Sequence, residues 1–190
     1  MRFLKSKANI AENVRYVLRD KDGNIKPLFK YNPVFAWLKK HGIVTRDIKS
    51  LLTGSFVNEL VVSNLVTNAG MALVAGRING SGSPAAATYI AIGTGAVAAA
   101  AADTALGTES SGNGADRAAA TVSLTTTDVA NDTARLVKTF TFTGSFALTE
   151  SGVFNAASTG TLLARQVFSA INVISGDSLQ ITWDFDVDTV

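Results

Sequence analysis

The last segment of the chain shows the clearest alternation of apolar and polar residues. From Leu179 to Val187, apolar Leu179, Ile181, Trp183, Phe185 and Val187 alternate with polar Gln180, Thr182, Asp184 and Asp186. A period of two is typical of a β-strand that turns one face toward a core and the other toward solvent. The pattern therefore predicts a strand whose large apolar side chains, including Trp183 and Phe185, point inward.

Similar segments precede it at short intervals. They run from Thr121 to Thr126, Ala134 to Thr143, Phe146 to Phe154 and Leu162 to Ile171. The second of them places Leu136, Phe140 and Phe142 on one face, with Lys138 as the polar exception. Several strands of similar length at short spacing favour an antiparallel β-sandwich or a jelly-roll-like domain. The predicted fold is mainly β with minor α.

The N-terminal region predicts a hairpin followed by a short helix. Val14 to Arg19 alternates in polarity, the turn residues Lys21 to Asn24 follow, and Ile25 to Phe29 supplies a second strand. Asn32 can cap a helix that starts at Pro33 and stops at Gly42. Its apolar stripe of Val34, Trp37 and Leu38 has to pack on something, because an isolated helix this short is marginal in water. This region reads as a hairpin-helix extension.

The middle of the chain alternates between regular elements and a poorly apolar stretch. Phe56 to Val66 predicts a strand, and Thr67 or Asn68 can cap a helix that ends at Asn79-Gly80. Thr88 to Ile92 predicts another strand. Residues 93–120 then hold five glycines, many alanines and few large side chains, which cannot bury much apolar area. We expect a long exposed Gly/Ala-rich loop there, with one helical turn around Ala98 to Leu106.

Charge divides the chain into two unequal regions. Residues 1–50 hold 12 Lys and Arg against 4 Asp and Glu, a formal charge of +8, whereas residues 51–190 hold 5 against 11, a charge of −6. We predict a basic N-terminal arm or anchor over residues 1–54 and a β-rich domain over residues 55–190. Candidate interaction residues in the arm are Arg15, Arg19, Trp37, Lys39 and Lys40.

The partner of such an arm is expected to be acidic. An acidic protein neighbour, including another copy of this chain, fits the opposite charge of the body. Nucleic acid fits less well, because the basic residues are scattered rather than grouped in a block and no recognised nucleic-acid-binding motif accompanies them.

Composition excludes several classes of site. The chain has no cysteine and a single histidine, His41, so it lacks a disulfide framework and a thiolate metal site and suits folding in a reducing cytoplasm. The first ten residues carry no apolar run typical of a secretory signal. No stretch is long and apolar enough for a spanning helix, so we expect no membrane contact.

Motifs for catalysis or cofactor binding are incomplete. Gly93-Thr94-Gly95 follows a predicted strand, as in a dinucleotide site, but the third glycine is replaced by Ala98 and no βαβ unit follows, so a strand leaving through a glycine turn is favoured. Residues 149–153 lack the first glycine of a hydrolase elbow. His41 lies in the last turn of the short helix, where a cation favours the helix dipole. We predict no enzyme activity, no catalytic residue and no cofactor.

Alternating carboxylates on the last strand offer one further possibility. Asp184, Asp186 and Asp188 share the polar face and could form a calcium site if loop oxygens converged on them. A solvated face, or a charge partner for the basic arm, is the favoured interpretation. We therefore predict no metal ligand.

Segments spread over residues 60–187 resemble a pattern found in structural proteins of tailed bacteriophages. The first set is Val66 to Gly70, Tyr89 to Gly95 and Asp103 to Glu109; the second is Thr149 to Asn155, Leu163 to Gln166 and Gly176 to Trp183. Proteins with this pattern are tail-fibre-like, minor tail or decoration components. The basic first quarter lies outside the resemblance.

This resemblance implies assembly rather than chemistry. It leads us to expect an accessory virion protein of the tail tip, baseplate or fibre, assembled in the bacterial host cytoplasm, that packs against other virion proteins and against copies of itself, with a trimer as the first expectation. A capsid decoration (cement) protein is one alternative. A carbohydrate-binding module for host recognition is another, and would be expected to expose Trp or Tyr near residues 93–120.

Overall fold

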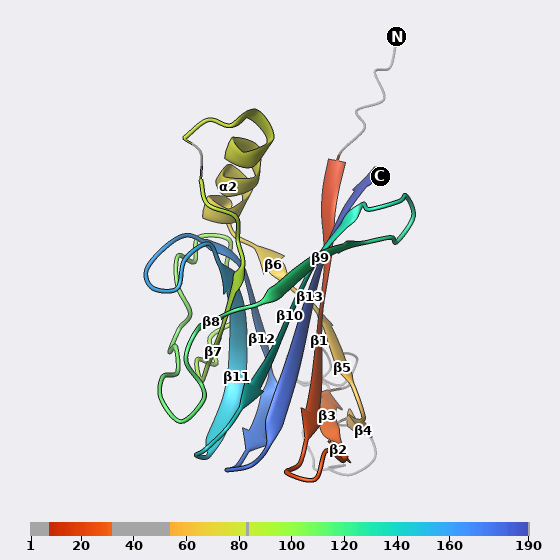
Figure 1. Ribbon diagram of the computed structural model, residues 1–190, viewed down its shortest axis with the longest axis vertical. Helices are drawn as coiled ribbons and strands as arrows, with labels where there is room; N and C mark the ends of the chain where they lie inside the picture. The colour runs from red at the N-terminus through yellow and green to blue at the C-terminus, as the bar shows by residue number, and fades with distance from the viewer. Residues whose placement is uncertain (1–7, 32–53, 83, 190) are drawn as a thin grey trace, which may run out of the picture.

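The protein is a mainly β antiparallel sandwich, as the strand pattern predicts. A computed structural model describes residues 8–31, 54–82 and 84–189. Two antiparallel sheets face each other with their strands along the long axis of the molecule (Figure 1). One helix lies at the end of the sandwich where the first described strand begins and the last one ends. The predicted helix from Pro33 to Gly42 lies outside the described residues.

The first sheet is built around two long strands. Its order is β2 (Ile25–Lys26), β1 (Ala8–Arg19), β13 (Ser178–Thr189), β10 (Thr133–Thr141) and β9 (Thr121–Thr125), and β5 (Leu60–Ser63) pairs with the same side of β1 as β2. β1 and β13 pair over their whole length, from Ala8 opposite Thr189 to Arg19 opposite Ser178. The two ends of the described chain therefore lie side by side.

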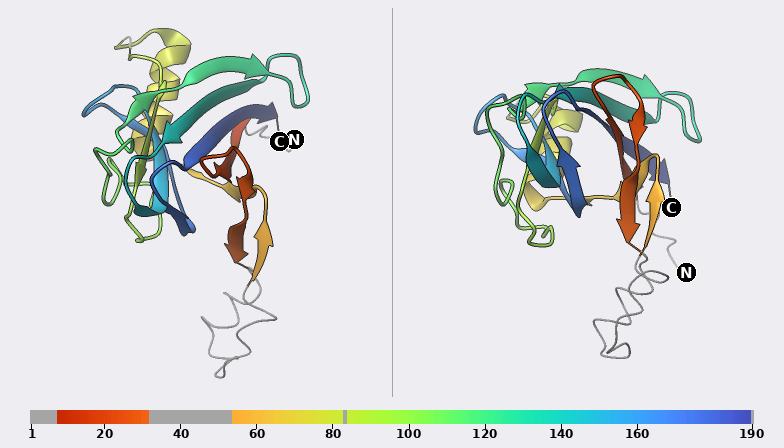
Figure 2. Two further views of the ribbon diagram at one scale, coloured as in Figure 1. Left: turned by 60° about the horizontal axis from the view of Figure 1, so that its bottom comes forward. Right: turned by 90° about the horizontal axis from the view of Figure 1, so that it is seen from below.

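The second sheet covers the first. Its order is β6 (Leu65–Val66), β12 (Leu162–Val173), β11 (Phe146–Phe154), β7 (Tyr89–Gly93) and β8 (Ala118–Ala119). A separate ribbon of β3 (Leu28–Tyr31) and β4 (Gly54–Val57) projects to one side (Figure 2). The single predicted strand from Phe56 to Val66 is divided among β4, β5 and β6 because the chain crosses there from the ribbon through the first sheet to the second.

The core lies between the two sheets and is rich in aromatic side chains. Tyr16 and Trp183 are fully buried, and the Tyr16 ring lies 4.3 Å from the Phe168 ring of the opposite sheet, centroid to centroid. The Tyr16 hydroxyl shares a 2.7 Å hydrogen bond with the Ser151 hydroxyl, so its polar atom is satisfied inside the core. Burial raises the pKa of Tyr16 far above its ordinary value, although the bond to Ser151 opposes that shift.

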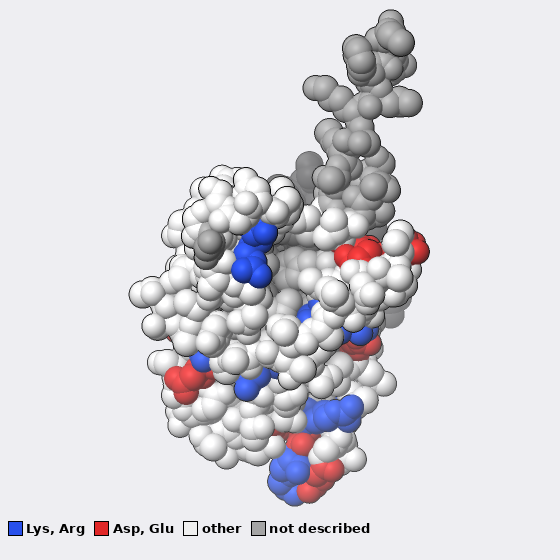
Figure 3. Space-filling view, turned by 45° about the horizontal axis from the view of Figure 1, so that its top comes forward, with Lys and Arg blue, Asp and Glu red and all other residues white. Residues whose placement is uncertain are grey.

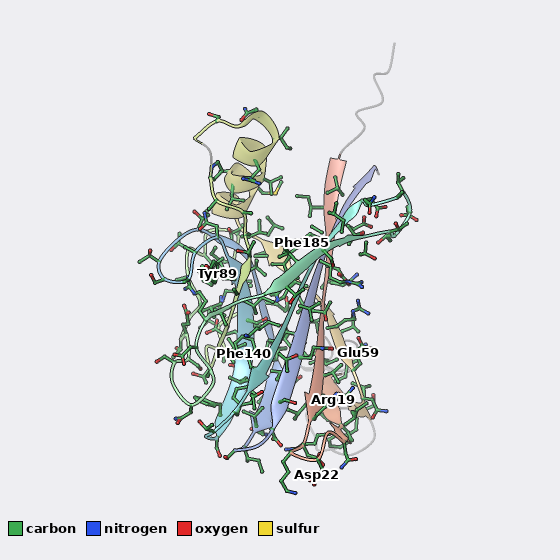
Figure 4. The ribbon with its side chains drawn as sticks, in the orientation of Figure 1. Arg19, Asp22, Glu59, Tyr89, Phe140 and Phe185 are labelled. Carbon is green, nitrogen blue, oxygen red and sulfur yellow. The ribbon has the colours of Figure 1, made fainter. Side chains whose placement is uncertain are left out.

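The predicted inward face of the last strand is confirmed at four of its five positions. Leu179, Ile181, Trp183 and Phe185 are buried, whereas Val187 is 61% exposed. Val187 lies opposite Ile10 near the end of β13, and Phe185 is the last residue of this strand in the buried cluster. Figure 4 shows Phe140 in the middle of the sandwich and Phe185 nearer that end.

The predicted hairpin is present at its turn, where Ile25 and Lys26 of β2 pair with the end of β1. The rest of its predicted second strand belongs to β3, which pairs with β4 instead. The first strand of the hairpin does not stand apart from the body. Val14, Tyr16 and Leu18 of β1 belong to the same buried cluster as the residues of β10, β12 and β13. β1 lies between β13 on one side and β2 with β5 on the other. The boundary at residue 54 drawn from charge therefore does not separate β1 from the packed core.

The helix α2 (Asn68–Asn79) has the ends that its sequence predicts. The Thr67 side chain accepts a 2.9 Å hydrogen bond from the Gly70 amide, and Gly80 ends the helix in the left-handed conformation. Gly70 lies so close to the Leu163 carbonyl of β12 that a Cβ would overlap it. In the described part of the chain no helix is long and apolar enough to cross a membrane.

Candidate functional site

The Gly/Ala-rich loop, residues 94–117, is held against the outer face of the second sheet by Glu150 of β11. The Glu150 side chain is fully buried. Its Oε1 accepts hydrogen bonds from the Gly95 amide at 2.9 Å and the Thr108 amide at 2.7 Å, and its Oε2 accepts one from the Gly107 amide at 2.9 Å. Two distant parts of the loop are thus joined through one carboxylate.

Arg165 of β12 completes this contact and extends it. Its Nη2 lies 2.7 Å from Glu150 Oε2 and donates to the Val97 carbonyl at 3.0 Å, while its Nη1 donates to Asp103 Oδ2 at 2.7 Å. The guanidinium is 3% exposed. We call Glu150, Arg165 and Asp103, with the loop groups that they bind, the loop-fastening network.

Hydrogen bonds as well as ion pairs stabilise the charged groups of this network. The Ala100 amide and Arg165 hold the pKa of Asp103 below its ordinary value, although burial opposes them. Burial alone would lower the pKa of Arg165, but its bonds to Asp103 and Glu150 raise it above the ordinary value. Asp103 and Arg165 are therefore charged at neutral pH and bound to each other.

An irregularity in the pairing of β11 with β12 places Glu150 on the outer face. The pairing with β12 shifts between Leu148 and Glu150, and beyond the shift Ser151 and Val153 face the core while Glu150 and Phe154 face the loop. Thr149, which the shift leaves unpaired with β12, donates its hydroxyl hydrogen to the Gly95 carbonyl at 2.9 Å. β-bulges commonly reorient a side chain in this way.

Glycines allow the loop backbone to approach the carboxylate. A Cβ at Gly95 would overlap Glu150 Oε1, and a Cβ at Gly93 would overlap the Thr108 carbonyl oxygen. The Gly93-Thr94-Gly95 sequence is thus the glycine turn at the end of a strand that we predicted. Its glycines serve close approach to an anion, as in a phosphate loop, but the anion here is Glu150 of the same chain.

A small apolar cluster supports the other part of the loop. Leu106 packs with Ala91, Phe154 and Leu162 on the outer face of the second sheet. A Cβ at Gly152 would lie 2.9 Å from Leu106 Cδ2, so glycine leaves the space that Leu106 fills. The helical turn predicted for Ala98 to Leu106 is wrong. Residues 94–107 form no helix, because their backbone groups bond to Glu150, Arg165 and neighbouring loop segments instead.

Arg117 closes the loop where it returns to the sheet. Its guanidinium lies 3.5 Å above the centre of the Phe154 ring, in cation–π contact, and Nη2 lies 2.6 Å from Glu109 Oε2. The same guanidinium donates to the carbonyls of Ala156 and Thr159. Most residues of the loop are exposed, as the composition predicts, and the loop is held to the sheet at both ends.

Four segments that are far apart in the sequence meet in this network. Glycines come from Tyr89 to Gly95, Asp103 and the Gly107 and Thr108 amides from Asp103 to Glu109, Glu150 from Thr149 to Asn155, and Arg165 from Leu163 to Gln166. Both oxygens of Glu150 and the Nε, Nη1 and Nη2 atoms of Arg165 are engaged with other groups of the protein. The arrangement holds a loop in place.

The candidate interaction residues of the arm fall into two groups. Trp37, Lys39 and Lys40 lie outside the described residues, as does His41. Arg15 donates to Asp184 Oδ2 at 2.8 Å, and Arg19 donates to the Gly23 carbonyl within the β1–β2 turn. Figure 4 shows Arg19 and Glu59 on the side formed by β1 and β5, away from Tyr89 on β7. The structure brings neither arginine to the loop-fastening network.

Cations of the basic region pair with acids of the body. Asp184 binds Arg15 of β1 and Arg135 of β10, the latter at 2.6 Å, and Lys26 of β2 lies 2.5 Å from the buried carboxylate of Asp177. For Asp184 the charge-partner interpretation is thus confirmed. Among the described residues no group of three or more His, Asp or Glu is placed to hold a metal ion. Figure 3 shows acidic and basic side chains gathered at the lower end of the molecule, and smaller groups of both signs elsewhere on that face.

Sequence reasoning did not single out Glu150, Arg165 or Asp103 as site residues. A signal was present, because Glu150 and Arg165 are single charged residues inside two otherwise largely uncharged strands. Charged side chains are seldom fully buried unless they are paired, so two such charges on predicted neighbouring strands could have suggested an ion pair.

No protein-family model, curated protein or solved structure matches this chain.

Proposed function

We propose that this protein is an accessory structural component of a tailed-phage virion, located at the tail tip, baseplate or fibre, that acts by packing against neighbouring proteins and copies of itself. The observation that supports the proposal is the loop-fastening network. Segments that resemble virion proteins, although far apart in the sequence, supply the charged groups and the glycines of this single network.

The network supports a packing role through rigidity. Glu150 and Arg165 use their polar atoms to join loop backbone to two strands, so the Gly/Ala-rich loop presents a fixed surface. A surface that is ordered before binding loses less conformational entropy when a partner docks on it. A component built into a large particle benefits from that property at every contact.

Exposed apolar side chains provide further support. Val97 in the loop, Val129 in the β9–β10 turn, Ile78 on α2 and Phe56 on β4 are all exposed large apolar residues. Burying a large apolar side chain against a partner is favourable, so each of these side chains gains from being covered by a neighbour. Their distribution over several elements suits a protein with more than one neighbour.

The proposal is tested by locating the protein in intact phage particles. Antibodies raised against the purified protein and coupled to gold should label the tail tip, baseplate or fibres in electron micrographs, and the signal should vanish when the antibodies are first absorbed with the protein. Label on the head would support the capsid decoration alternative instead. Purified particles that contain none of the protein by mass spectrometry would overturn the proposal.

The carbohydrate-binding alternative requires a different outcome. It predicts that the purified protein is retained by host surface polysaccharide. Trp183, the one tryptophan among the described residues, is fully buried in the core, and Tyr89 is half-buried, so neither offers an open aromatic platform. We expect no retention, and saturable binding to such a polysaccharide would favour the alternative.

A further inference from the structure

The strand β9 forms an edge of the first sheet, where a second copy of the chain can pair with it. Among the described residues β9 is the last strand of the first sheet and pairs with β10 alone, from Thr121 opposite Val137 to Thr125 opposite Thr133. Alternate residues of such a strand direct their backbone N–H and C=O groups away from the sheet. Figure 2 shows β9 at the rim of the molecule, with no strand drawn beyond it.

This edge lacks the features that usually prevent strands from pairing. Natural edges are protected by shortness, charge, proline or a bulge. The other edge strands of the sandwich are shorter: β2, β6 and β8 have two residues each and β5 has four. β9 has five residues, Thr-Val-Ser-Leu-Thr, with no charge and no proline, and its pairing with β10 is regular.

Side chains on β9 continue the apolar face of the core into solvent. Val122 lies opposite Leu136 and Leu124 opposite Ala134, so both point to the side of the sheet that carries Trp183. Val122 is nevertheless 54% exposed and Leu124 63% exposed. The other face of β9 carries only hydroxyl groups, from Thr121, Ser123 and Thr125.

We infer that β9 pairs with β9 of a second copy of this chain, in antiparallel orientation about a two-fold axis at Ser123. This inference rests on the part of the proposed function that has the protein act through contacts between its copies. In that register Val122 faces the partner's Leu124 and Leu124 faces the partner's Val122. Hydroxyl side chains face hydroxyl side chains on the other side, where Thr and Ser pairs form hydrogen bonds across strands.

A second copy suits this edge better than a charged peptide. The strand is uncharged, so two copies meet without repulsion although each body is acidic and each N-terminal region basic. The pattern is palindromic in character, apolar at the positions on either side of Ser123 and hydroxyl-bearing at the next positions out, which is what a two-fold contact requires. The two first sheets then join into one continuous sheet.

The contact is expected to be weak when the protein is free in solution. A pair of five-residue strands buries less than the roughly 1,200 to 2,000 Å² of a standard stable interface, so dissociation in the micromolar range or above is expected. Sedimentation equilibrium over a wide concentration range should show a monomer–dimer equilibrium. A two-fold contact predicts a dimer in place of the trimer that the resemblance suggests.

The first test uses the absence of cysteine from the chain. A Ser123→Cys variant has a single thiol, and across the two-fold axis two such thiols lie within the spacing of directly opposed strand residues, about 4.5 to 5.5 Å between Cβ atoms. Mild oxidation should produce a covalent dimer. The matched control is Gln180→Cys, which is also exposed but lies on the inner strand β13 between β1 and β10, and it should cross-link much more slowly. Equal rates for the two variants would overturn the inference.

The second test adds charge to the edge. Ser123→Lys places two like charges face to face, and should weaken the dimer by at least about tenfold while circular dichroism and the melting temperature stay unchanged. Gln180→Lys, on the inner strand β13, should associate like the parent protein. If Ser123→Lys also dimerises like the parent, or if the parent is monomeric at the highest soluble concentration, the contact does not exist. Should Ser123→Lys fail to fold, the cysteine comparison decides.

The two proposals fail separately. A protein that labels virions but dimerises independently of Ser123 would retain the proposed function and refute the β9 contact. A protein absent from virions that still dimerises through β9 would refute the virion role and retain the contact.

Discussion

Glu150 and Arg165 are buried charges, and their surroundings explain how the sandwich accommodates them. Removing an ion from water is costly, and a buried pair is tolerated when good geometry and additional hydrogen bonds satisfy the remaining atoms. Here the additional bonds come from the Gly95, Gly107 and Thr108 amides and from the Val97 carbonyl. The ion pair and the loop therefore depend on each other.

Neutralising Glu150 tests this dependence. Glu150→Gln removes the charge opposite Arg165 and turns an N–H donor toward loop amides, so the free energy of unfolding should fall by about 3 to 5 kcal/mol in urea denaturation. Hydrogen exchange at Gly95, Gly107 and Thr108 should accelerate more than exchange in β13. Glu109→Gln is the control, since Glu109 pairs with Arg117 at a more exposed position and should cost under about 1 kcal/mol. Equal losses for both variants would contradict the network's role.

At the level of single elements, the strand β13 shows how far periodicity specifies packing. Phe185 stacks on Trp183 with ring centroids 5.8 Å apart, on the face that the alternation predicts. The polar face is more varied than its pattern suggests, because Asp184 binds two arginines and Asp186 accepts a hydrogen bond from Thr133. Gln180 is exposed on that face.

The register of β13 is tested by substitutions on its two faces. Phe185→Ala should lower the free energy of unfolding by about 3 to 5 kcal/mol, because it removes a buried aromatic side chain and leaves a cavity. Gln180→Ala, on the exposed face of the same strand, should change it by less than about 0.5 kcal/mol. Thermal melts followed by circular dichroism measure both. Similar melting temperatures for the two variants would show that the faces are assigned wrongly.

The helix α2 was predictable at its ends but not in its position. Thr67, Asn79 and Gly80 carry local capping and stop signals that act within a few residues. Gly70 carries no such signal, yet it is the residue that lets the helix approach the Leu163 backbone of β12. From the sequence alone, a glycine near the start of a helix can be explained in several ways. Only the tertiary structure shows that Gly70 is needed for close contact with β12.

For the whole molecule, the division between basic and acidic regions does not coincide with how the chain packs. β1, from the basic region, pairs along its entire length with β13, from the acidic region. Arg15 and Lys26 bind Asp184 and Asp177, so part of the opposite charge is matched within one chain. The opposite charges of the two regions therefore form ion pairs between strands of the same sandwich.

Removal of residues 1–53 should therefore prevent folding. The charge division predicts that a truncated chain whose first residue lies near Ser50 stays folded and β-rich. Such a truncation, however, removes Val14, Tyr16 and Leu18 from the core and leaves one long side of β13 unpaired. We expect loss of the cooperative thermal transition and aggregation. A synthetic peptide of residues 8–31 added during refolding should restore part of the β-sheet signal. A deletion product with a normal melt would show that β1 is dispensable.

The sequence alone determined the elements and their class. Alternation of apolar and polar residues, caps and turn residues act over a few positions, so the sandwich strands from Thr121 onward, the strand ending at Gly93, the β1–β2 turn and the ends of α2 were predictable. The mainly β sandwich followed from the number and spacing of those strands.

Tertiary structure decided which residues meet. Glu150 reaches Gly95 across 55 positions and Arg165 reaches Asp103 across 62, and no local pattern specifies a pairing at such separation. The composition of residues 93–120 indicated a loop with little apolar area to bury, and correctly so, but the loop is ordered by polar bonds to buried charges that belong to other strands. The place of β1 was decided in the same way, because strand order depends on which edge offers a matching partner, and that is settled only when the sheets assemble.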